Sequence, residues 1–83
     1  MNKVFIKLYV PIIEQKYEMF MPINKPICDI IELLVRAIND LVDSDYVLTT
    51  ETGLYNKDTG VKYNSDLKII DTDIKNGIEL VLI

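Results

Sequence analysis

The sequence predicts an α+β domain in which one main helix packs on one face of a mixed β-sheet of four or five strands. Three observations predict this class. Residues 3–21 hold two stretches of alternating apolar and polar residues, residues 27–42 repeat apolar residues at helical spacing, and residues 78–83 are apolar on both sides of an extended strand. With 83 residues, 49% of them hydrophobic, residues 1–83 have the size and composition of one domain with a packed core.

The two alternating stretches predict a β-hairpin. Along residues 3–10 the aliphatic residues fall on one face, which is expected to be buried: Val4, Ile6, Leu8 and Val10. Residues 16–21 alternate again, with Tyr17, Met19 and Met21 facing inward. Pro11 cannot donate to a sheet ladder, so the first strand is expected to end before it.

A helix is predicted over residues 27–42. Its apolar residues form one stripe: Ile27, Ile30, Ile31, Leu34, Ile38 and Leu41. Pro26 suits the first turn of the helix, where a missing N–H costs nothing. Glu32 and Arg36 are spaced for an ion pair on the opposite side. Cys28 is expected to be a small residue at the edge of the core rather than a reactive thiol.

Shorter elements are predicted between the helix and the final strand. Residues 46–50 are β-prone, and short strands are expected at 54–55 and 61–63, with turn residues between them. Asp71 and Asp73 suit a short turn in which their side chains accept hydrogen bonds from backbone N–H groups. Ile69 and Ile74 are expected to anchor that turn to the core.

The final strand is expected to be central in the sheet. Ile78, Leu80 and Leu82 point one way, and Glu79, Val81 and Ile83 point the other, so both faces are largely apolar. Asn76-Gly77 before it predicts a turn, because both residues tolerate positive φ. If the first and last strands are parallel neighbours, the helix is a right-handed crossover. That arrangement is the β-grasp, or ubiquitin-like, fold.

Composition and charge exclude several functions. The net charge is −4 and the positive residues are scattered, which argues against nucleic acid as a partner. No apolar run is long enough for membrane insertion, and a single cysteine suits a reducing cytoplasm. The chain has no histidine, no nucleophile–base pair and no phosphate loop, so we expect no catalysis and no cofactor. Asp40, Asp43 and Asp45 lack the glycine and the distal glutamate of a calcium loop, so no metal site is expected.

The face of the sheet away from the helix is the predicted site of function. Alternation places apolar residues there: Phe5, Tyr9, Phe20, Val81 and Ile83. Charged residues frame them: Lys3, Lys7, Lys16, Glu18 and Glu79. Because the first and last strands are neighbours, Phe5, Tyr9, Val81 and Ile83 are expected to form one contiguous patch. Such a patch typically marks the binding site of a protein partner or a second copy of the chain.

The closing segment IIDTDIKNGIELVL at residues 69–82 resembles the closing motif of ubiquitin-like domains. The chain also resembles the small bacterial YukD/EsaB-type proteins of type VII (WXG100) secretion systems, whose strand-to-helix junction is similar to MPINKPI at residues 21–27. Ubiquitin and the sulfur carriers act through a Gly-Gly tail, whereas this sequence has no glycine after Gly77, so conjugation is not expected. The resemblance implies a cytoplasmic, non-enzymatic accessory protein that contacts secretion components. The alternative is a stand-alone β-grasp adaptor in an unrelated bacterial assembly.

Overall fold

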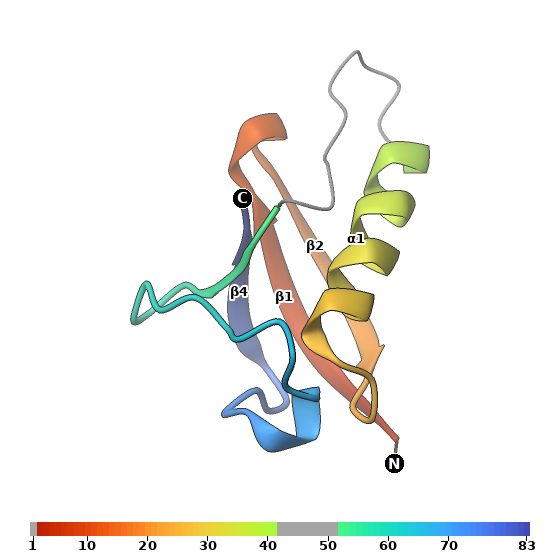
Figure 1. Cartoon of the computed structure of the whole chain (residues 1–83). Helices are drawn as coiled ribbons and strands as arrows, with labels where there is room; N and C mark the ends of the chain where they lie inside the picture. Colours follow the sequence, from red (N-terminus) through yellow and green to blue (C-terminus); the bar gives the residue numbers. More distant parts are fainter. Residues whose placement is uncertain (1, 42–51) are drawn as a thin grey trace.

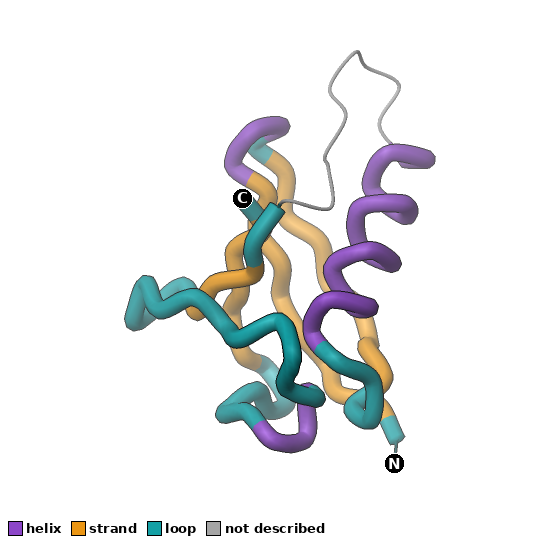
Figure 2. The backbone as a smooth tube through the Cα atoms, viewed as in Figure 1, coloured by secondary structure: helices purple, strands orange, loops and turns teal. Residues whose placement is uncertain are grey.

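Among the residues that the structure describes, four strands form one mixed sheet and a single long helix covers one of its faces (Figures 1 and 2). The structure is a computed structural model that describes residues 2–41 and 52–83. The regular elements are β1 (Lys3–Val10), β2 (Gln15–Pro22), α1 (Ile27–Leu41), β3 (Leu54–Asn56) and β4 (Ile78–Leu82). Two short 3₁₀ turns accompany them, η1 (Pro11–Ile13) and η2 (Ile69–Asp71). The predicted α+β class and the hairpin-helix order are confirmed.

Strand β4 lies in the middle of the sheet, as its two apolar faces predict. The strand order is β2-β1-β4-β3, with β4 parallel to β1 and antiparallel to β3. Leu80 and Leu82 are fully buried beneath the helix. Since β1 and β4 are parallel, the chain between them must cross from one end of the sheet to the other, and α1 forms part of that crossover.

The turn before β4 fixes how β4 aligns with β1. Gly77 has φ +85°, a conformation that costs glycine nothing, and its N–H donates to the carbonyl oxygen of Phe5 at 2.9 Å. The side-chain oxygen Oδ1 of Asn76 accepts the N–H of Phe5, also at 2.9 Å. These two bonds extend the hydrogen bonding between β1 and β4 by one residue beyond Ile6 and Ile78, the first pair in the register. The Asn76-Gly77 pair therefore sets the register of the two central strands.

The core lies between α1 and the sheet. The buried side chains of β1 are the four that alternation predicts, and α1 buries Ile27, Ile30, Ile31, Leu34, Val35 and Ile38. The predicted helical stripe is wrong at its end, because Leu41 is 69% exposed. Figure 1 shows the reason: the last turn of α1 stands away from the strands. Val35, which the predicted stripe omits, is buried instead.

The short segments differ from their predictions in two details. Cys28 is exposed, because α1 turns Ile27 and Ile31 into the core and leaves Cys28 on the outer side. The expected strand at 61–63 is reduced to one bridge, between Tyr55 and Lys62. The β-prone residues 46–50 lie outside the described residues.

The turn that precedes β4 is stabilised by a threonine rather than by the two aspartates that the sequence suggested. The hydroxyl of Thr72 donates to the carbonyl oxygen of Ile69 at 2.7 Å and accepts the N–H of Ile74 at 3.2 Å. A hydroxyl can do both, whereas a carboxylate can only accept. Ile69 and Ile74 are buried, so the predicted anchoring of this turn to the core is confirmed.

Candidate functional site

The candidate site is the sheet face opposite α1, called here the open face. Strand alternation builds it: with Ile6 and Leu8 buried under the helix, Phe5, Lys7 and Tyr9 must emerge on the other side. The same rule brings Val81 to this face, since Leu80 and Leu82 point into the core. The sheet thus presents side chains from all its strands on this face.

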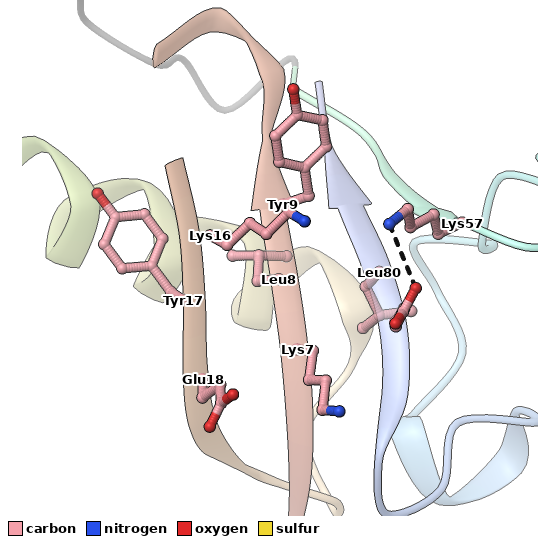
Figure 3. Close-up of a pocket in the computed structure, with 9 residues that line it drawn as sticks. Lys7, Leu8, Tyr9, Lys16, Tyr17, Glu18, Lys57 and Leu80 are labelled. Atoms are coloured by element: carbon pink, nitrogen blue, oxygen red, sulfur yellow. Dashed lines mark ion pairs between the residues drawn. The ribbon is translucent and has the colours of Figure 1, made fainter. Parts of the chain in front are cut away.

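A row of alternating charges crosses the middle of the open face. Lys7 of β1 lies opposite Glu18 of β2 on one side and Glu79 of β4 on the other. Lys57, the residue after β3, extends the row: its N–H donates to the carbonyl oxygen of Glu79 at 3.1 Å, and its Nζ lies 3.3 Å from Glu79 Oε2. Figure 3 shows these four side chains and the Lys57–Glu79 ion pair. We call Glu18, Lys7, Glu79 and Lys57 the charged row.

The charged row contributes little to folding. The side chains of Lys57 and Glu79 are 41% and 44% exposed, and an ion pair so open to water is worth at most about 1 kcal/mol. Opposite charges on neighbouring strands add a similar small amount. The row is more informative as a surface pattern, because the order of charges on a protein surface affects which surfaces are complementary to it.

One end of the open face is rich in tyrosine. The register aligns Tyr9 of β1, Val81 of β4 and Tyr55 of β3 across the sheet. Lys16 of β2 lies opposite Tyr9 and completes this line. Ile83, two residues beyond Val81, is 63% exposed. We call Tyr9, Val81, Tyr55 and Ile83 the tyrosine end.

The other end of the open face is an aromatic pair. Phe5 and Phe20 are cross-strand partners, and their ring centroids lie 5.3 Å apart at an interplanar angle of 55°. This tilted geometry is favourable for two aromatic rings. Phe20 is a large apolar side chain on the edge strand β2, and it is 59% exposed. We call these two residues the phenylalanine end.

The expected single patch is therefore divided. The structure brings Tyr9 and Val81 together, but it places Phe5 at the opposite end, with the charged row between the two apolar groups. The reason is the register: β4 begins beside Ile6, so Glu79 faces Lys7 and Val81 faces Tyr9. Alternation alone predicts the face on which a residue lies, not its neighbours on the adjacent strands.

Sequence reasoning missed Tyr55 and Lys57. The signal for Tyr55 was present, because Leu54 is apolar and fully buried, so the next residue of an extended strand must face outward. Lys57 carried no comparable signal. Its position depends on a turn of the chain that becomes visible only in three dimensions.

Asn56 builds that turn. Its side-chain Oδ1 accepts the N–H groups of Asp58 at 2.8 Å and Thr59 at 3.2 Å, and its carbonyl oxygen accepts the N–H of Gly60 at 2.8 Å. An asparagine side chain that bonds to the next N–H groups replaces the ladder with a local turn. Lys57 is thereby held beside Glu79 at the end of the charged row.

The same asparagine supports a second polar contact. Its Nδ2 donates to the hydroxyl of Tyr63 at 3.2 Å, and that hydroxyl donates to Asp73 Oδ1 at 2.7 Å. Burial and the hydrogen bond to Asp73 raise the pKa of Tyr63 to about 12. The hydrogen-bonded series Asn56–Tyr63–Asp73 ties the turn after β3 to the segment before β4.

The part of the surface formed by the described residues has hollows. One, of about 370 Å³, lies over the open face between the charged row and Tyr9. Another, of about 460 Å³, lies between the start of α1 and residues 52–65, beside Cys28. Within the described ranges, no group of three or more acidic, cysteine or histidine side chains is placed to hold a metal ion. No helix in that part of the chain is long and apolar enough to cross a bilayer.

The sheet order, the parallel central pair and the single covering helix define a ubiquitin-like β-grasp domain. Solved structures show the same fold. The ubiquitin-like domain of the Mycobacterium tuberculosis type VII secretion protein EccD1 has a TM-score of 0.76 at 11% identity, over 100% of this chain and 99% of that one. The ubiquitin of Caldiarchaeum subterraneum has a TM-score of 0.73 at 15% identity, over 96% and 90% of the two chains.

A larger assembly contains a similar domain. A chain of the MycP5-free ESX-5 inner membrane complex matches with a TM-score of 0.72 at 12% identity, over 99% of this chain but only 21% of that one. This chain therefore spans about a fifth of that protein. No protein-family model and no curated protein sequence matches. At these identities, the structural likeness establishes the fold and confirms the predicted ubiquitin-like architecture.

Proposed function

We propose that this protein is a non-enzymatic, cytoplasmic, ubiquitin-like accessory protein of a bacterial type VII secretion system, similar in role to the YukD/EsaB-type proteins. It acts by binding protein partners through the open face and not by conjugation. The observation that carries the proposal is the open face itself, an ordered surface with a charged row and two aromatic ends. Backbone bonds between Gly53 and Ile83, at 2.8 and 3.0 Å, hold the tyrosine end in the sheet.

Two observations support the secretion context. The closing motif and the MPINKPI junction of the sequence resemble the secretion-associated proteins. Two of the solved structures with this fold belong to type VII secretion, the EccD1 domain and the ESX-5 complex. The second candidate function is a stand-alone β-grasp adaptor of another assembly. The likeness to a ubiquitin favours it, because the fold also occurs outside secretion.

Affinity purification from the native host tests the proposal. The wild-type chain is expected to retain a WXG100 protein or a component of the secretion membrane complex. Phe20→Asp places a charge at the phenylalanine end and is expected to lose that component. Phe20 is 59% exposed, so the change costs the fold little.

Ile70→Asp is the matched control. Ile70 is 61% exposed and lies in η2, so the substitution introduces the same charge at the same exposure away from the open face. This variant is expected to keep the partner. Recovery of partners unrelated to secretion would favour the adaptor. Equal binding by Phe20→Asp and wild type would remove the open face from the proposal.

A further inference from the structure

We propose that one occupant of the open face is a second copy of this chain, related to the first by a two-fold axis that runs along the strands between β1 and β4. This inference rests on the proposed function, because it takes the open face as protein-binding. It follows from the order of charges in the charged row. Read across the sheet, the row is negative, positive, negative, positive.

Such a row is complementary to itself when it is reversed. A two-fold axis parallel to the strands turns the second sheet over and reverses its strand order. Lys7 of one copy then faces Glu79 of the other, and Glu18 faces Lys57, so that each of the four side chains meets the opposite charge. Because the axis passes between the two central strands, each contact occurs twice, as in any two-fold interface.

A two-fold axis at right angles to the strands is disfavoured by the same charges. An axis along the charged row leaves the strand order unreversed, so Lys7 would face Lys7 and Glu79 would face Glu79. Like charges in direct opposition cost several kcal/mol at an interface. Of these two arrangements, the charge pattern therefore favours the one in which the strands of the two copies run in the same direction.

The tyrosine end fits that orientation. Reversal places Tyr9 of one copy over Val81 of the other, and Lys16 over Tyr55. The first contact is apolar, and the second sets a lysine ammonium over an aromatic ring, which is attractive. Packed sheets lie about 10 Å apart, a gap that a facing lysine and glutamate can span. The hollow of about 370 Å³ over this face gives the facing side chains room to interdigitate.

The size of the face predicts a weak dimer. Four strands about 4.8 Å apart and about 20 Å of strand length offer roughly 400 Å² per copy, against about 800 Å² in a stable interface. The dissociation constant is therefore expected to be micromolar or weaker. Because the central contacts are ion pairs, it is expected to rise with salt concentration.

A charge-swap experiment tests the arrangement. Sedimentation velocity of the wild-type chain should show dimers that dissociate at high salt. Lys7→Glu sets carboxylates against carboxylates, and Glu79→Lys sets ammonium groups against ammonium groups. Each variant alone is expected to dimerise at least about tenfold more weakly. An equimolar mixture of the two restores every opposite pair at these positions and is expected to associate at least as well as the wild type.

Arg36→Glu and Glu32→Lys are the matched controls. Each of them breaks an ion pair of 2.8 Å on α1 and changes the net charge by the same amount as the corresponding test variant, so dimerisation should be unaffected. Thermal melting of each variant checks that it is folded. A wild-type chain that stays monomeric, or a mixture that associates no better than its components, overturns the inference. If a secretion component is still retained through the open face, the proposed function stands without the dimer.

Discussion

Replacing Asn56 tests how much its side-chain hydrogen bonds stabilise the turn after β3. The side chain is 8% exposed and makes three hydrogen bonds, two to backbone N–H groups and one to the hydroxyl of Tyr63. Asn56→Ala removes all three and leaves the two N–H groups of residues 58 and 59 without that acceptor. The expected result is a large loss of stability from a single small side chain.

The magnitude follows from the bonds. Each buried hydrogen bond contributes about 1 kcal/mol net, so the loss is about 2–3 kcal/mol if water replaces part of what is removed. A domain of this size has about 4–12 kcal/mol in total. The melting temperature should therefore fall by roughly 10–20 °C, since each kcal/mol shifts a domain of this size by about 4–8 °C.

Urea unfolding and thermal melting measure the effect, with Asn64→Ala as the matched control. Asn64 makes one such bond, at 2.9 Å to the N–H of Asp66, in an exposed turn. Water can replace that bond, so the control is expected to lose less than about 1 kcal/mol. Equal losses in the two variants would refute the argument that burial makes Asn56 important.

Two further predictions concern the core and the pH response. Leu80→Ala should lower the free energy of unfolding by about 3–5 kcal/mol, because β4 is central and Leu80 is fully buried. Leu33 is 47% exposed, so Leu33→Ala should lower it by less than about 1 kcal/mol. Equal losses in urea titrations of the two variants would contradict a central β4. The pKa of Tyr63 is raised to about 12 in the folded state from an ordinary value of 10.0, so the stability it adds is complete below pH 10 and is lost as the pH rises toward 12. The wild type should be more stable than Tyr63→Phe by a free energy of unfolding of the order of 1 kcal/mol, after allowance for solvent screening. This difference should disappear between pH 10 and pH 12. A difference that stays constant with pH would disprove the raised pKa of Tyr63.

Much of the fold could be predicted because it depends on periodicity and on a few special residues. Alternation in residues 3–10 fixes which side of β1 is buried, and Gly77 marks the turn before β4. The end of α1 could not be predicted in this way. Leu41 has the right helical phase, but burial also requires a strand beneath it, and that depends on the angle between the helix and the sheet.

The candidate site was predictable only in part, for a related reason. The sequence indicates that Phe5 and Tyr9 share a face of the sheet. It does not indicate that Glu79 of β4 pairs with Lys7, the residue midway between them. That relation follows from register, and nothing in the periodicity of either strand distinguishes one register from another shifted by two residues. Such a shift would keep every side chain on its face and every core residue inside.

The register is decided by the turn that precedes β4, and this links a local feature to the proposed interaction. Asn76 and Gly77 bond the backbone of Phe5, which places Glu79 beside Lys7. Shifted by two residues, β4 would set Val81 beside Lys7, and the order of charges that makes the open face complementary to itself would be lost. A turn that contributes nothing to the open face directly therefore determines the order of charges on that face, on which the proposed dimer depends.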